Sequence, residues 1–214
     1  MHNYSRLFGL LISLGLLCCT QVEHKRSARA AVNKVAKKPI ATVIVIQPFN
    51  GFPAYLTQMV SVELKKMYKG TVIVRKSIPF PKNTLNYTKV RYRADSLIRH
   101  LSRVTPKGQL TIGLTNKDIS TTKGEYPDWG IMGLGYCPGK SCIASTYRLK
   151  AGNLGEKLFK VAIHELGHTQ GLPHCPVKTC LMRDAQGKDH LNEEKEFCPK
   201  CKKVLVKAGW SFLD

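Results

Sequence analysis

A run of metal-binding residues near the C-terminus restricts this chain to few folds. His164 and His168 are four residues apart, so on a helix both imidazoles project from one face and can bind one metal ion. Glu165 would project beside them, toward the open coordination position. This arrangement suits metal-assisted hydrolysis, in which zinc lowers the pKa of a bound water to about 7 and a carboxylate takes its proton.

The neighbouring residues predict that this segment is helical over residues 156–170. Asn153, with Glu156 three residues later, resembles a capping box, in which each residue satisfies a free backbone N–H group at the helix start. An apolar stripe runs through the same segment at helical spacing. Its members are Leu158, Phe159, Ala162, Ile163 and Leu166.

Gly171 and Pro173 would end this helix, because glycine tolerates the left-handed turn of a helix terminus and proline cannot continue a helix. The chain would then turn back, so that His174 reaches the same metal as a third ligand and one position stays open for water or substrate. A bare H-E-x-x-H sequence is only a moderate signal. Gly171 and His174 at the metzincin spacing argue strongly against coincidence.

Four cysteines follow the histidines in two pairs. Cys175 and Cys180 are five positions apart, and Cys198 and Cys201 are three positions apart. This pattern suits a closed zinc site, in which each short loop donates two thiolates to one tetrahedral ion. The alternative is a pair of disulfides. The Cys-Pro-Lys-Cys turn favours metal, whereas an exported location would favour oxidation.

Taken together, these residues resemble the signature of the archaemetzincin family. The shared positions are His164, Glu165, His168, Gly171, His174, Cys175, Cys180, Met182, Cys198 and Cys201. The resemblance implies a zinc metallopeptidase in which the three histidines bind a catalytic zinc, Glu165 is the general base and Met182 lies beneath the metal. It also implies a second, structural zinc on the four cysteines. Fifteen residues separate Met182 from Cys198, slightly fewer than the family pattern, which indicates a trimmed loop.

The residues before the site predict an α/β (α+β) fold. Strand-like and helix-like segments alternate, which favours a mixed, twisted sheet flanked by helices. With the resemblance, this predicts one compact metzincin-like zincin domain over residues 39–214. The expected strands are residues 41–47, 71–75 and 110–114, and the expected helices are residues 95–104 and a segment that begins at Pro53 and stops at Gly70.

Two further strands are expected just before the active-site helix, at residues 131–136 and 142–148. We expect the second of them to lie near the sheet edge, where Ile143 to Tyr147 would pair with the backbone of an extended peptide substrate. The alternative is a purely structural hairpin. In an oxidising compartment Cys137 and Cys142 could close a disulfide across the intervening turn.

The N-terminus has the pattern of an export signal. Arg6 precedes a mainly apolar run of eleven residues, 7–17, which is too short to span a bilayer but typical of a signal-peptide core. Cys19, or less well Cys18, resembles the acylated cysteine of a bacterial lipoprotein, so residues 1–19 are interpreted as a lipoprotein-type signal peptide. The protein would then be exported to the bacterial cell envelope, with possible membrane association through the lipid. The alternatives are ordinary signal-peptidase cleavage and a buried apolar segment.

The charge balance offers a rival function. A net charge of +20 with a cysteine-bound zinc is compatible with a nucleic-acid binder, because clustered cations release counterions from phosphate. The distribution of charge argues against this function. Residues 1–38 hold seven basic residues and one acidic residue, so the rest of the chain keeps +14. Residues 20–38 place basic side chains among small residues with little apolar periodicity, so we interpret them as a basic, solvated linker. Residues 87–93 interleave aromatic and basic residues and are expected to form a solvated loop or strand, and His100 and His190 have no ligand partners in the sequence.

A second alternative is a catalytically weak, zinc-stabilised binding protein at the cell envelope. Glu165 argues for hydrolysis, because a pure binding module has no physical need for a carboxylate at the water position. The sequence therefore favours a peptidase that binds two zinc ions and acts on peptides or proteins.

Overall fold

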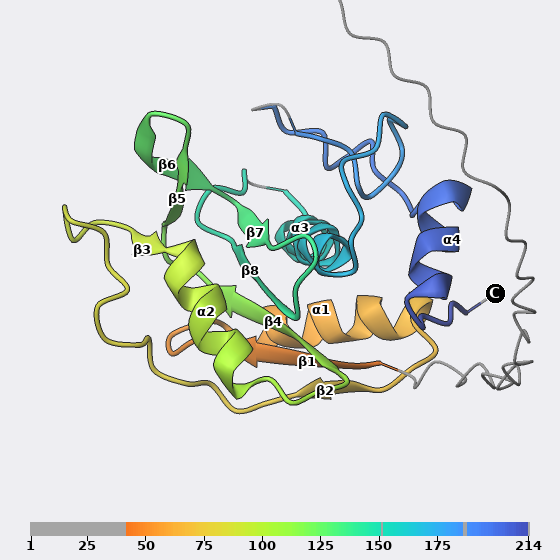
Figure 1. Cartoon of the computed structure of the whole chain (residues 1–214), viewed down its shortest axis with the longest axis horizontal. Helices are drawn as coiled ribbons and strands as arrows, with labels where there is room; N and C mark the ends of the chain where they lie inside the picture. Colours follow the sequence, from red (N-terminus) through yellow and green to blue (C-terminus); the bar gives the residue numbers. More distant parts are fainter. Residues whose placement is uncertain (1–41, 151, 186–187, 214) are drawn as a thin grey trace, which may run out of the picture. The chain divides into compact units, whose positions relative to one another are not determined.

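A five-stranded sheet forms the centre of the protein in the computed structural model, which describes residues 42–150, 152–185 and 188–213 (Figure 1). The strand order is β2-β1-β4-β8-β7. Neighbouring strands are parallel except β7, which is antiparallel to β8. The strands are β1 (Val43–Pro48), β2 (Val72–Val74), β4 (Gln109–Thr115), β7 (Gly133–Gly135) and β8 (Ser141–Ser145).

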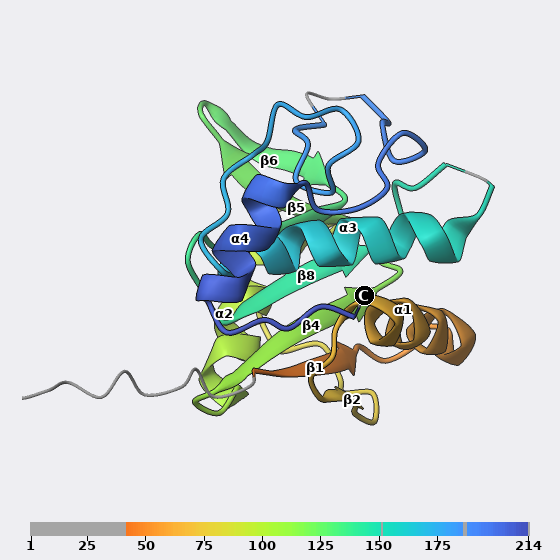
Figure 2. The ribbon, with the colours of Figure 1, turned by 90° about the vertical axis from the view of Figure 1, so that its right-hand side faces the viewer.

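Helices cover both faces of this sheet. One face packs against α1 (Ala54–Met67) and α3 (Leu154–Thr169), and the other packs against α2 (Ala94–Val104) (Figure 2). Alternate residues of β8 enter the two cores, since Ala144 packs on the α1 and α3 side and Ile143 on the α2 side. The predicted mixed α/β fold is confirmed, and the predicted strands and helices are present with ends shifted by a few residues.

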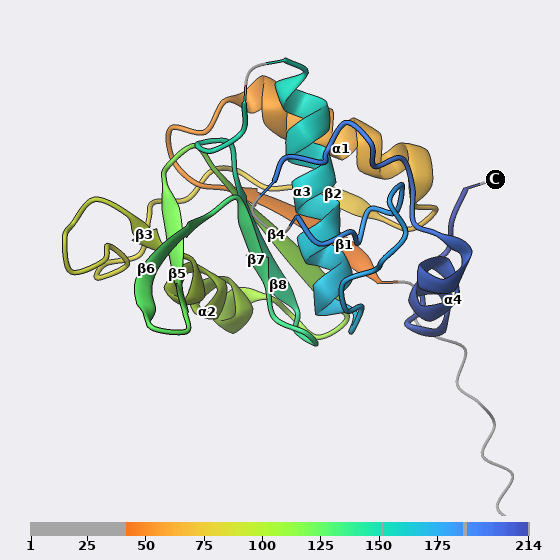
Figure 3. The same cartoon turned by 90° about the horizontal axis from the view of Figure 1, so that it is seen from above.

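A second, smaller sheet has the order β3-β5-β6. It consists of β3 (Tyr92–Arg93), β5 (Ile119–Lys123) and β6 (Tyr126–Ile131), and β5 and β6 form an antiparallel hairpin. Seen from above, β7 lies between this hairpin and α3 (Figure 3). The end of the predicted loop or strand at residues 87–93 thus becomes β3. The sequence did not reveal the β5–β6 hairpin or α4 (Pro199–Lys207).

The expected edge position of Ile143 to Tyr147 is wrong. Ile143 lies in β8, which pairs with β4 on one side and with β7 on the other, so the edge of the sheet beside α3 is β7. The reason is that β7 is a three-residue Gly-Leu-Gly strand, too short and too poor in side chains to carry a strand pattern. The two expected strands, β7 and β8, do form a hairpin, and β7 is its outer strand.

The disulfide that the sequence left open between Cys137 and Cys142 is not formed in this structure. Both residues are free thiols. Cys142 is fully buried in the core beneath α3, whereas the exposed Cys137 donates a hydrogen bond from its thiol to the Leu172 carbonyl at 3.6 Å. The turn between β7 and β8 therefore points the two side chains at different surroundings.

The signal peptide, the lipidation at Cys19 or Cys18 and the linker lie outside the described residues. They stay predictions, as does the exported location. Within the described part of the chain, no helix is both long enough and apolar enough to cross a membrane.

Candidate active site and metal centres

Helix α3 carries His164, Glu165 and His168. Its start is fixed as predicted, since the Asn153 side chain accepts a hydrogen bond from the Glu156 backbone N–H at 3.3 Å. Beyond its end, Gly171 adopts a left-handed φ of 84°, which redirects the chain toward the metal-binding face.

The three histidines converge as predicted. The Nε2 atoms of His164 and His168 lie 3.1 Å apart, and the candidate ligand atoms of these two residues and His174 lie within 4.8 Å of one another. Tetrahedral zinc with Zn–N bonds of about 2.05 Å would hold nitrogens about 3.4 Å apart. The donor set and its spacing therefore fit one zinc ion.

Backbone carbonyls orient two of these rings. Nδ1 of His164 lies 2.8 Å from the Leu181 carbonyl, and Nδ1 of His168 lies 2.7 Å from the Leu172 carbonyl. A carbonyl only accepts, so each Nδ1 carries the proton and each Nε2 is left with the lone pair that a metal needs. Burial, with the neighbouring His168, lowers the pKa of His164 to about 4, which keeps its ring neutral and ready to bind metal.

His174 completes the set from a loop rather than from the helix. Its side chain is about half exposed, and its Nδ1 lies 3.5 Å from an Asp184 carboxylate oxygen. The backbone just after it is fixed, because the Cys175 N–H donates to the Met182 carbonyl at 2.7 Å. The cysteine cluster thus begins at the residue that follows the third histidine.

Met182 lies against α3, the helix that carries His164 and His168, and its place beneath the metal stays a prediction. It is fully buried, and a side chain at Gly167 of α3 would overlap its sulfur. The contact between Gly167 and Met182 therefore sets how closely the loop approaches the helix that carries His164 and His168.

Glu165 is partly buried between α3 and the edge strand β7. Loss of hydration raises the pKa of its carboxyl group to about 8, and a hydrogen bond from the Gly135 backbone partly opposes this rise. A proton-transfer group with a pKa near neutrality, placed beside three convergent imidazoles, is the arrangement expected of a general base.

The four C-terminal cysteines form a second cluster. The sulfur atoms of Cys175 and Cys198 lie 3.7 Å apart and those of Cys180 and Cys201 lie 3.8 Å apart, with all four within 4.8 Å. Tetrahedral zinc with Zn–S bonds of about 2.3 Å would separate its thiolates by about 3.8 Å. A disulfide would require about 2.05 Å. The spacing therefore favours a closed zinc site over two disulfides.

Backbone N–H groups support a thiolate in this cluster. Met182 and Cys198 each point a backbone N–H at the Cys180 sulfur, at 3.5 and 3.4 Å. Such donors stabilise a negative sulfur without neutralising it.

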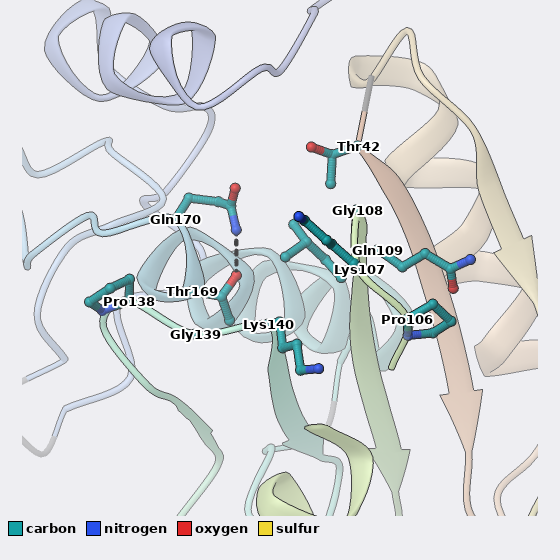
Figure 4. A pocket seen from close by; sticks show the side chains of 11 residues that line it. Thr42, Pro106, Lys107, Gly108, Gln109, Pro138, Gly139, Lys140, Thr169 and Gln170 are labelled. Carbon is teal, nitrogen blue, oxygen red and sulfur yellow. Dashed lines mark hydrogen bonds between the residues drawn. The ribbon is translucent and has the colours of Figure 1, made fainter. Parts of the chain in front are cut away.

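The structure has two hollows of about 470 Å³ each. One is lined by His174, Arg183 and His190 among others, but His190 pairs with Glu193 at 3.2 Å and lies outside the histidine cluster, as the sequence indicated. The other lies at the C-terminal end of α3, where Thr169 and Gln170 face Lys107 and Lys140 (Figure 4). None of the three histidines lines this second hollow, so it is distinct from the candidate active site.

A model of peptidase family M54 matches residues 58–207, which is well over half of the chain. The chain belongs to this family. An archaemetzincin from Haloquadratum walsbyi is 27% identical over 176 residues, which cover 76% of this chain and 99% of that protein. One from Halobacterium salinarum is 28% identical over 173 residues, which cover 75% of this chain and 97% of that protein.

Crystal structures of archaemetzincins share the fold. The Archaeoglobus fulgidus protein, complexed with malonate, is 25% identical with a TM-score of 0.63, over 76% of this chain and 99% of that one. The Methanopyrus kandleri protein is 24% identical with a TM-score of 0.67, over 78% of this chain and 95% of that one. This member of family M54 is thus a zinc metallopeptidase of the archaemetzincin type.

Proposed function

We propose that this protein hydrolyses peptide bonds at the three-histidine site, with Glu165 as the general base. The observation that carries the proposal is the convergence of three imidazoles beside Glu165, a partly buried carboxylate on the helix that also carries His164 and His168. When bound, zinc would supply a Lewis acid and lower the pKa of a water to about 7.

The residues of the chain divide the remaining work. His164, His168 and His174 would hold the metal, and the carbonyls of Leu181 and Leu172 keep the first two rings in the tautomer that binds it. Glu165 would take a proton from the attacking water and deliver it to the leaving amine. A cation at the histidines favours the charged carboxylate, so the pKa of Glu165 would fall below about 8 when the site is loaded.

Strand β7 offers the surface on which a substrate backbone would bind. The Ser145 N–H donates to the Met132 carbonyl at 2.8 Å, so in the antiparallel register Gly133 and Gly135 are at the positions whose backbone groups point away from β8. An extended peptide could pair, as an added strand, with those of these groups that do not bond to Glu165. Such pairing uses the main chain and so accepts substrates of varied sequence.

Peptide cleavage with chelation tests the function. Zinc-loaded protein should cut members of a diverse peptide library, a hydroxamate should inhibit it by occupying the open metal position, and zinc should restore activity after chelation. If the metal-loaded protein cuts no peptide, the peptidase proposal fails and the alternative of a zinc-stabilised binding protein takes its place.

We expect two zinc ions per chain. Three imidazoles and four thiolates form two complete ligand sets, of which one is closed and one leaves a position free. Elemental analysis of purified protein, with quantification of free thiols, measures this number. A single zinc together with oxidised Cys175, Cys180, Cys198 and Cys201 would refute the structural site.

A further inference from the structure

The edge strand β7 lies directly against the Glu165 side chain. A methyl group added to Gly133 would sit 2.6 Å from Cγ and 2.7 Å from Oε1 of Glu165, and 2.8 Å from a methyl carbon of Val161. These separations are well below the usual 3.5–4.0 Å contact between non-bonded carbon atoms. The Glu165 side chain therefore occupies the space that a side chain at position 133 would need.

Gly135, two residues along the same face of β7, contacts a different part of Glu165. Its backbone forms the hydrogen bond that opposes the rise in the pKa of the Glu165 carboxyl group. A side chain at Gly135 would overlap the Glu165 backbone carbonyl, which belongs to the rigid helix and cannot move aside. Gly135 thus determines how closely β7 approaches the backbone of α3, whereas Gly133 restricts only the position of the Glu165 side chain.

Backbone conformation does not explain these two glycines. Neither is among the described glycines with a left-handed φ, so alanine could adopt the same backbone at both positions. Glycine is needed at both positions because the face of β7 that packs against α3 leaves no room for a side chain.

We propose that Gly133 is a positioning residue for the general base. By leaving room on the inner face of β7, it fixes where the Glu165 carboxylate lies relative to the histidines and to a peptide on the strand edge. This inference rests on the proposed role of Glu165 as the base. The main-chain groups that would pair with substrate are the same with glycine or alanine, so the effect belongs to turnover and not to binding.

Gly133→Ala should lower kcat about 10- to 100-fold, since a displacement of about 1 Å in a reacting group costs up to this factor. KM should stay within about twofold and both zinc ions should be retained, because the substitution alters neither the strand edge nor a metal ligand. Steady-state kinetics on one cleaved peptide, with zinc counted in the same samples, measure all three quantities.

Shortening the base provides a rescue. Glu165→Asp removes one methylene and withdraws the carboxyl group from Gly133, so Gly133→Ala added to Glu165→Asp should change kcat by less than about threefold. Equal losses in both backgrounds would show that Gly133 acts independently of Glu165 and would overturn the inference.

Gly113→Ala is a matched control. A methyl group there would lie 2.7 and 2.8 Å from the side chains of Leu101 and Ile143, a comparable overpacking on the α2 face of the sheet. It should lower the melting temperature while leaving kcat per folded molecule unchanged. A loss of kcat as large as that of Gly133→Ala would mean that general strain, not the position of Glu165, lowers turnover.

The remaining outcomes separate this inference from the proposed function. If Glu165→Ala is inactive but Gly133→Ala has a kcat within about twofold of wild type, the positioning role is refuted and the general base stands. If Glu165→Ala is fully active, the proposed function itself fails. If Gly133→Ala does not fold, the comparison moves to a Val161→Ala background, which removes the Val161 contact, and an unchanged kcat there overturns the inference.

Discussion

Glu165→Ala should keep zinc at both sites and lose most of its peptidase activity. Glu165 is not a ligand in the proposed site, so its removal leaves the three histidines and four cysteines intact. General acid–base groups contribute about 10²- to 10⁴-fold to turnover, and Glu165 would also orient the attacking water. The measurement is kcat on a cleaved peptide, with zinc determined on the same sample.

Two substitutions at the same position serve as controls. Glu165→Gln keeps the shape of the side chain and removes the base, so it should be nearly as inactive as Glu165→Ala. Glu165→Asp keeps a displaced base and should retain more activity than either. A kcat for Glu165→Gln equal to that of wild type would show that this residue does not transfer the proton, and a loss of zinc from any variant would point to a structural role instead.

Cys198→Ser should destabilise the protein far more than His174→Ala. Structural zinc contributes folding free energy outright, with apparent values of about 10–16 kcal/mol in zinc-finger peptides, whereas an open three-ligand site mainly determines chemistry. The cysteine cluster also joins the loop at Cys175 and Cys180 to the start of α4 at Cys198 and Cys201. Thermal unfolding of both variants in the presence of zinc measures the difference.

Cys137→Ser is the matched control for this comparison, because Cys137 is an exposed free thiol outside the four-cysteine cluster. Its melting temperature should stay close to that of wild type, because a serine hydroxyl can also donate to the Leu172 carbonyl. A larger fall in melting temperature for His174→Ala than for Cys198→Ser would contradict the division between a catalytic and a structural site.

The parts of the site that depend on local spacing could be predicted from the sequence. His164 and His168 meet because residues four apart share a helix face, and Asn153 caps α3 through a contact within one turn. The short loops that carry the cysteines likewise bring thiolates together through local geometry. In each case the residue type and its spacing contain the physical cause.

The parts that depend on strand pairing could not be predicted in the same way. Whether β8 or β7 forms the sheet edge is decided by partners far apart in the chain, and Gly133-Leu134-Gly135 offers no alternating pattern. The carbonyls of Leu172 and Leu181 that orient the histidines are equally hidden, because every residue has a carbonyl. The role of Gly133 follows only from the distance between β7 and Glu165.

The most direct test is peptide cleavage in water enriched in oxygen-18, with products analysed by mass spectrometry. Zinc-loaded wild-type protein should generate new carboxyl termini that carry one heavy oxygen each, because hydrolysis places an oxygen atom from water on the cleaved carbonyl. Glu165→Ala with the same zinc content should generate almost none. New termini that form equally in both proteins, or no new termini from wild-type protein that holds its zinc, would contradict this account.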